Sequence, residues 1–136
     1  MVCVVYTNLS FSQTEATKIQ FCDDALYFTA FEDIRKASSD NPFGRNVIVQ
    51  YDSSIKTYYI EYENSDYEKE KMQLTFIQDI SDDDTKLAIY KDQDGNMINV
   101  LDDIENKKFL MLYMVDQIND VKKNLCYVML NIQRCE

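Results

Sequence analysis

The residues best suited to chemistry in this sequence are carboxylates gathered in short acidic stretches. The stretch DQDGN, residues 92–96, resembles the start of a calcium-binding loop, in which oxygen-bearing side chains alternate along the chain. A calcium loop places glycine sixth and a bidentate glutamate twelfth, whereas here glycine is fourth and the glutamate is missing. Asp-Gly also predicts a hairpin turn, because glycine accepts the positive φ of tight turns. We favour the turn.

Two further acidic stretches, SDDD (residues 81–84) and LDDIE (residues 101–105), are expected to project carboxylates from loops. Consecutive side chains rarely converge on one hard cation without ligands from elsewhere in the chain. We therefore interpret SDDD as a solvated acidic loop rather than a cation site, and we expect no metal ion and no other cofactor.

The chain contains no histidine, which removes the commonest general base, any Ser-His or Cys-His pair, and histidine-ligated zinc. Glycine-rich phosphate loops and nucleophile elbows are also missing from the sequence. Catalysis by carboxylates or lysine stays open, but no motif points to it. We expect a protein that is not an enzyme.

The four cysteines, Cys3, Cys22, Cys126 and Cys135, form no C-x-x-C pair, so neither a zinc knuckle nor a thioredoxin-type site is indicated. An even number permits two disulfides, yet a chain of this size does not require them. We expect free thiols, with Cys22 and Cys126 partly buried as small apolar side chains. Cys3 and Cys135, near the termini, are expected to be more exposed.

The net charge of −10 argues against direct binding to nucleic acid or to anionic membranes, since both are bound through Lys and Arg. The charge favours a basic protein partner or serves solubility, and both interpretations stay open. The apolar run at residues 2–6 is shorter than a secretory signal requires, and no stretch reaches the length of a membrane span. We expect a chain made in the cytosol without a signal peptide, or a mature fragment, with no membrane insertion.

Short segments in which apolar and polar residues alternate predict an all-β fold, and 136 residues suit a single domain, residues 1–136. The expected strands are residues 2–6, 18–21, 25–28, 46–51, 56–63, 72–77, 86–90 and 125–132. The polar CDD, residues 22–24, is interpreted as a hairpin turn. Residues 29–38 suit a helical turn or a short helix, and FLMLYMV (residues 109–115) is either a buried strand or a helix.

The alternation also predicts which side chains face the core. The expected inward sets are Val47, Val49 and Tyr51; Tyr58, Ile60 and Tyr62; Leu74 and Phe76; Leu87 and Ile89; and Val128, Leu130 and Ile132. The row Tyr58, Tyr59, Tyr62 would suit a binding face, because tyrosine is frequent at interfaces. We favour the alternative, in which Tyr59 alone points outward.

Four stretches, in order, resemble the interleukin-1 superfamily of cytokines, and within it the interleukin-18 type. They are KIQFCDDALYF (residues 18–28), FEDIRKASSDNPFGRNVIVQY (residues 31–51), LTFIQDISDDDTKLAIYKDQDGNM (residues 74–97) and NVLDDIENKKFLMLY (residues 99–113). The resemblance implies a β-trefoil, a six-stranded barrel with a hairpin cap and a short helix or two. It also implies leaderless secretion, which agrees with unpaired cysteines.

The resemblance further implies a monomeric ligand that binds immunoglobulin-like receptor ectodomains, or a soluble binding protein, in immunity and inflammation, as agonist or antagonist. The matching positions are Asp24 in the first hairpin and Glu32, Asp33 and Ile34 in the FED segment. Carboxylates there would meet basic receptor groups, with Ile34 as the apolar anchor. Pro42 and Gly44 would shape the rim loop, with Gly44 allowing a sharp exit into the next strand.

A second hypothesis comes from the charge alone. An acidic intracellular interaction protein, for example of viral origin, would occupy a basic surface of a host protein or mimic nucleic acid. A receptor ligand should bind one ectodomain tightly, whereas a charge mimic should bind basic proteins broadly and lose affinity steeply with salt.

Overall fold

The computed structural model describes residues 18–30, 42–118 and 121–135, and these residues form a single antiparallel sheet with one short helix. The elements are β1 (Lys18–Ala30), β2 (Gly44–Asp52), β3 (Thr57–Glu63), β4 (Lys69–Asp79), β5 (Leu87–Lys91), β6 (Met97–Asp103), α2 (Ile104–Lys107), β7 (Phe109–Ile118), β8 (Val121–Met129) and β9 (Gln133–Arg134). The described part of the chain contains no helix long and apolar enough to cross a membrane.

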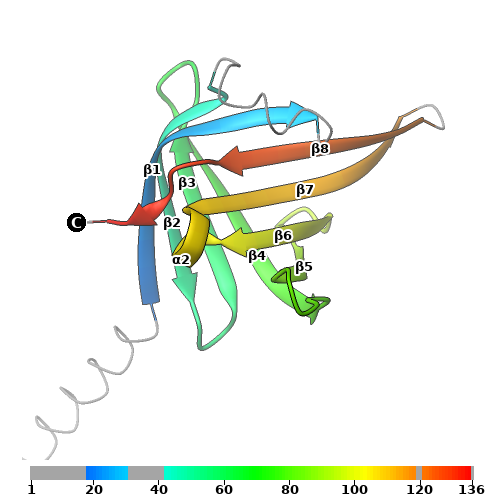
Figure 1. The fold of residues 1–136 in the computed structure, drawn as a ribbon. Helices are drawn as coiled ribbons and strands as arrows, with labels where there is room; N and C mark the ends of the chain where they lie inside the picture. The colour runs from blue at the N-terminus through cyan, green and yellow to red at the C-terminus, as the bar shows by residue number, and fades with distance from the viewer. Residues whose placement is uncertain (1–17, 31–41, 119–120, 136) are drawn as a thin grey trace, which may run out of the picture.

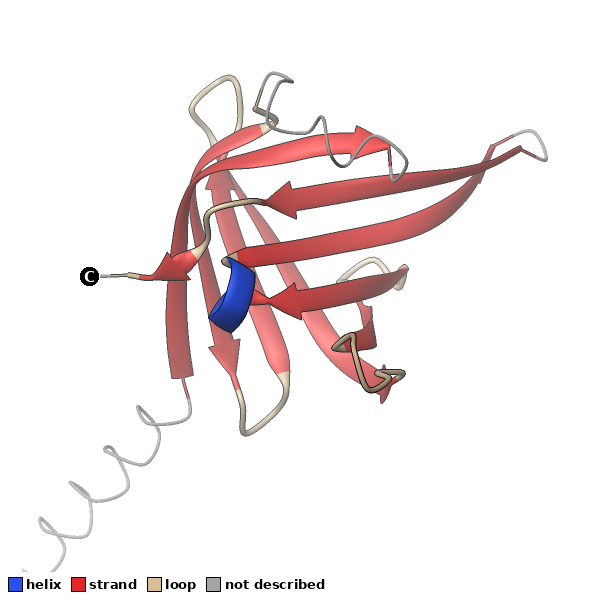
Figure 2. Cartoon of the chain, in the orientation of Figure 1, coloured by secondary structure: helices blue, strands red, loops and turns tan. Residues whose placement is uncertain are grey.

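The sheet closes into a barrel because β1 pairs with both β2 and β8, the first and last strands of the series β2–β8. From β2 to β8 each strand pairs with the next, and β1 then pairs with β8 along one part and with β2 along another (Figure 1). The two residues of β9 add to the edge of β1. Figure 2 shows that the described part of the chain is almost entirely strand and loop, with the short α2 as its helix. The all-β prediction is confirmed.

The β-trefoil is not confirmed. The described strands form an eight-stranded barrel in which sequence neighbours pair one after another, rather than six barrel strands with a hairpin cap. Antiparallel neighbours of this kind need only local pairing from β2 to β8, whereas the pairing of β1 with β8 joins distant parts of the chain and closes the ring.

The core lies inside the barrel and follows from the alternation along each strand. Tyr58, Ile60 and Tyr62 of β3 are buried, while Tyr59 is partly exposed on the outer face. The predicted inward face of β3 is therefore confirmed. The predicted inward residues of β2 (Val47, Val49 and Tyr51) and of β4 (Leu74 and Phe76) also lie in or against the core. The described part of residues 109–115 is a strand, which decides the alternative that sequence left open.

The predicted hairpin at CDD is wrong, because residues 18–30 form one continuous strand. Inward positions change from odd to even numbers within it: Phe21 and Leu26 are both buried, although five residues separate them. Asp23 lies where the alternation changes, and its carboxylate accepts hydrogen bonds from the Ala25 N–H (3.4 Å) and the Asn131 N–H (2.9 Å). Asp23 therefore stabilises the point in the middle of the strand where the inward face changes, rather than forming a turn.

Two other predicted faces are wrong. In β5 it is Ala88 and Tyr90, not Leu87 and Ile89, that join the core. In β8 the inward residues are Tyr127 and Met129, while Val128 lies in a second apolar cluster with Met111 and Cys126 on the opposite face of the sheet. Leu130 packs against that second cluster, and of the predicted set only Ile132 lies in the core. Both strands carry apolar residues on both faces, so the sequence pattern could not show which face points into the barrel.

One end of the barrel is closed. Ile104 of α2 and Ile132, which follows β8, are both buried in the core, and the Ile132 N–H donates to the Lys108 carbonyl at 2.9 Å. A disulfide between Cys22 and Cys135 fixes the segment that carries Ile132 to β1. The expectation of free thiols is therefore wrong for these two cysteines; Cys126 is buried outside this disulfide, and Cys3 lies outside the described residues.

Candidate functional site at the barrel mouth

A cavity of about 310 Å³ opens at the end of the barrel opposite α2. This end, which we call the mouth, is formed where β3 ends and β4 begins, and by the turn between β5 and β6. The cavity is lined from inside the barrel by Met72, Ile98, Leu112, Tyr62 and Tyr127. A volume of this size is at the lower end of the range for small-molecule sites.

The walls of the cavity are aromatic because four rings from distant segments pack together at the mouth. The Phe43 ring lies 5.9 Å from Tyr62 and 5.4 Å from Tyr127, measured between ring centroids. Phe28 of β1 packs against both Phe43 (5.5 Å) and Tyr127 (5.2 Å). These tilted pairs hold the two tyrosine rings in place beside the cavity.

Gly44 provides the space for this packing. A Cβ atom at this position would lie 2.5 Å from Cδ2 of the Tyr62 ring. Gly44 is therefore required for a close approach, not for the sharp exit from a loop that the sequence suggested. Pro42 and Phe43 precede it, and the Phe43 N–H donates to the Leu26 carbonyl at 2.8 Å.

A carboxylate faces the same cavity. Glu70 of β4 pairs directly with Tyr62 of β3, and directly opposed residues in an antiparallel pair lie on one face of the sheet. The Asn64 side-chain amide donates to Glu70 Oε1 at 3.1 Å. Burial, the nearby Tyr127 and the charge of Glu70 together raise the pKa of Tyr62, and burial raises the pKa of Tyr127. Both phenols are therefore neutral donors at ordinary pH.

The turn at residues 92–96 forms the acidic rim of the cavity. The Asp92 carboxylate accepts hydrogen bonds from the N–H groups of Asp94 (3.0 Å) and Asn96 (2.8 Å), and Gly95 adopts a φ of 89°. The predicted hairpin turn is confirmed. Gln93 then fastens the turn to β4, accepting the Gln73 N–H at 3.1 Å and donating to the Lys71 carbonyl at 3.2 Å.

The residues predicted from the cytokine resemblance are only partly described. Asp24 is exposed in β1 and borders a shallow hollow with Arg45 and Glu63. Glu32, Asp33 and Ile34 lie outside the described residues, as do the strand expected at residues 2–6 and most of the helical turn expected at residues 29–38. The structure therefore brings no described partner from the FED segment to Asp24.

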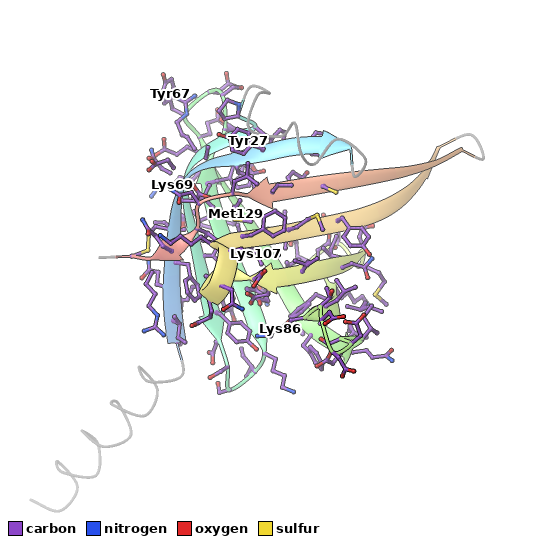
Figure 3. The ribbon with its side chains drawn as sticks, viewed as in Figure 1. Tyr27, Tyr67, Lys69, Lys86, Lys107 and Met129 are labelled. Carbon is purple, nitrogen blue, oxygen red and sulfur yellow. A yellow bond between two sulfur atoms is a disulfide. The ribbon has the colours of Figure 1, made fainter. Side chains whose placement is uncertain are left out.

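The other two acidic stretches lie together at the closed end. They line a groove of about 630 Å³, with residues 81–86 on one side and residues 101–107 on the other. Figure 3 labels Lys86 and Lys107, which come from these two segments. SDDD is an exposed turn in which the Asp82 carboxylate accepts the N–H groups of Asp84 (2.9 Å) and Thr85 (2.7 Å). No group of three potential metal ligands converges within the described part of the chain.

LDDIE is not the projecting loop that the sequence suggested. Its first residues end β6, and Asp102 points into the barrel, where its Oδ2 accepts the Tyr58 hydroxyl at 2.6 Å. Its Oδ1 accepts the Ile104 N–H at 3.2 Å. Burial first, and the Asp102 charge second, raise the pKa of Tyr58 far above that of free tyrosine.

The mouth cavity was missed from the sequence, although a signal for Glu70 was present. Residues 70, 72, 74 and 76 share one face of β4, so the inward alternation that identified Leu74 and Phe76 extends to a glutamate. Tyr127 gave no such signal, because β8 is apolar on both faces. Comparisons of the chain with protein-family models, with curated proteins and with solved structures returned no match.

Proposed function

We propose that this protein is a non-catalytic binding protein that holds a small organic molecule in the mouth of its barrel. The observation that carries the proposal is the cavity itself: apolar side chains form its floor and two tyrosines form its walls. Its rim is polar and is formed by Glu70, Lys71, Asp92, Gln93, Asp94 and Asn96. Small-molecule sites have this composition, and eight-stranded barrels are just wide enough to hold one small ligand.

A larger side chain in the cavity provides a direct test of the proposal. Met72 is half-buried and lines the cavity, whereas Met97 is exposed and does not. Met72→Trp should abolish binding of N-phenyl-1-naphthylamine, a neutral fluorescent probe, because the indole occupies the space of the ligand. Met97→Trp, the matched control, should bind the probe like the unmodified protein. Equal binding by both variants would remove the mouth from consideration as the site.

The disulfide supports a place of action for this protein. Structural disulfides persist in oxidising compartments and are rare in the cytosol, so Cys22–Cys135 favours an extracellular protein. Incubation with glutathione, mixed at the cytosolic ratio of its reduced to its oxidised form, tests this proposal. We expect the disulfide to stay closed, and a disulfide that is reduced under those conditions would favour an intracellular protein.

A second proposal retains receptor binding in immunity. The exposed carboxylate of Asp24 favours it, because rim charges steer association with basic partners. The proposal does not depend on a β-trefoil, since any rigid barrel can present an acidic edge to an immunoglobulin-like ectodomain. Asp24→Lys should weaken binding to such an ectodomain, measured by surface plasmon resonance, and unchanged binding would exclude Asp24.

The acidic groove at the closed end favours a basic protein partner in a different way. Its carboxylates include Asp82, Asp83, Asp84, Asp103 and Glu105. A partner recognised through this groove should lose affinity steeply with salt, and charge reversal at Asp83 should weaken binding. Retention of histone-like basic proteins after that change would contradict a role for the groove.

A further inference from the structure

We propose that the ligand of the mouth cavity is an organic cation: an ammonium group carried by a small aromatic or aliphatic body. This inference rests on the proposed function, because it names the chemical class of molecule that the same cavity holds. Its basis is the combination of an exposed carboxylate at the rim, two aromatic walls and an apolar floor.

Glu70 supplies the countercharge. Glu70 is exposed at the rim of the mouth. It lies directly opposite the buried Tyr62, so it shares the inward face of the sheet and borders the cavity. Its position is held by the Asn64 amide, which binds only one of its two carboxylate oxygens among the described residues. The second oxygen is available for a donor from a ligand.

Two lysines, Lys69 and Lys71, flank Glu70 on β4, and Lys71 is among the residues that line the cavity. Both alternate with Glu70 along the strand, so their side chains leave it on the opposite face. The Lys69 ammonium forms an ion pair with Glu61 at 3.2 Å on that face. In the described structure Glu70 forms no ion pair with either of these lysines.

The tyrosine walls suit the same kind of ligand. The faces of aromatic rings carry partial negative charge and attract ammonium groups, most strongly where water is partly excluded. Tyr62 is buried and Tyr127 half-buried, so both rings border the cavity in a partly desolvated setting. An ammonium group between these rings and Glu70 would gain from both, while its apolar body contacts Ile98 and Leu112.

Three molecules of one shape separate this inference from the function on which it rests. Tryptamine carries an ammonium group, tryptophol a neutral hydroxyl in its place, and indole-3-acetate a carboxylate. The protein has ten tyrosines and no tryptophan, so the fluorescence of the indole ring can be followed selectively with excitation at wavelengths that tyrosine does not absorb. We expect tryptamine to bind at least about tenfold more tightly than tryptophol, and indole-3-acetate not to bind.

Glu70→Gln provides the matched variant, because it removes the charge and keeps the shape of the side chain. Tryptamine affinity should fall about tenfold in this variant, while tryptophol affinity should not change. Glu105→Gln, at the opposite end of the barrel, makes the same change in net charge and should leave both affinities unaltered. A thermal unfolding curve for each variant confirms that the fold is kept.

Each result has a distinct meaning. If tryptamine and tryptophol bind equally, or if Glu70→Gln and Glu105→Gln behave alike, the cation is excluded while a small-molecule site stands. If none of the three indole compounds binds to the unmodified protein, and N-phenyl-1-naphthylamine does not bind either, the proposed function itself is overturned.

Discussion

The two ends of this barrel are built from the same chemical groups and differ in whether those groups have partners. At the closed end, the Tyr58 hydroxyl donates to Asp102 at 2.6 Å, and the rings of Tyr51 and Tyr90 pack beside it at 4.6 and 5.1 Å. At the mouth, Tyr62 and Glu70 face a cavity, and no hydrogen bond joins these two side chains in the described structure.

The difference shows how one strand serves two purposes. Tyr58 and Tyr62 lie four residues apart on the same inward face of β3. A polar pair that is satisfied inside the core adds to stability and specificity, whereas a polar pair left open toward a cavity can be completed by a ligand. The following predictions test whether the closed end is structural and the mouth is functional, beginning with the largest expected effect.

Loss of the disulfide should weaken the closed end most. Cys22→Ser combined with Cys135→Ser removes a link across 113 residues, which constrains the unfolded chain and fixes the segment that carries Ile132. We expect the free energy of unfolding to fall by about 2–5 kcal/mol, measured by urea denaturation. If the double variant lost ligand binding at the mouth without losing stability, the assignment of roles to the two ends would be reversed.

A methyl group at Gly44 should disturb the mouth directly. The added Cβ would lie 2.5 Å from the Tyr62 ring, so the ring must move or the strands must separate. We expect Gly44→Ala to cost about 1–3 kcal/mol in unfolding free energy and to lower affinity for N-phenyl-1-naphthylamine.

The control for this change is a double-mutant cycle with Tyr62→Leu. With the ring removed, the new methyl group meets no clash, and the cost of Gly44→Ala should become small. An equal loss of unfolding free energy in both backgrounds would mean that Gly44 is required by the backbone conformation at this position rather than by the close approach of the Tyr62 ring.

Much of the barrel wall could be predicted from the sequence, and the reason is visible in β3. There the two faces meet different surroundings, so Tyr58, Ile60 and Tyr62 alternate with polar or exposed residues. The turn at Gly95 was equally clear, because the left-handed φ that it adopts favours glycine. Local patterns of this kind identify strands and turns whatever the order in which the strands assemble.

The closure of the barrel and the mouth could not be predicted in the same way. They depend on β1 pairing with both β2 and β8, and no local pattern specifies a partner that far along the chain. Asp23 looked like a turn residue because its role, accepting the Asn131 N–H from beyond β8, is also long-range. The strand patterns thus fit a β-trefoil and this barrel equally well.

A matched pair of hydroxyl deletions compares the two ends within a single strand. Tyr58→Phe removes the donor to Asp102 and leaves that half-buried carboxylate with one partner fewer, so we expect a loss of about 1–3 kcal/mol. Tyr62→Phe removes a hydroxyl at the cavity and should change unfolding free energy by less than about 0.5 kcal/mol. Similar losses in both variants, measured by thermal and urea unfolding, would contradict the contrast between the ends.

Alkaline pH should reveal the closed end by a smaller, graded effect. Burial and the Asp102 charge raise the pKa of Tyr58 in the folded protein above the value of about 10 for an unfolded chain. The folded state therefore keeps a proton that the unfolded state loses, so the stabilisation is complete below pH about 10 and declines as pH rises further. Each such tyrosine lowers the free energy of unfolding by about 1.4 kcal/mol per pH unit in that range.

Tyr58→Phe should make this decline with pH shallower by that amount. Leu74→Ala, which destabilises the core without removing a phenol, should keep the original slope. If Tyr58→Phe left the slope unchanged, Tyr58 would ionise within the folded barrel, and the closed end would be as open to water as the mouth.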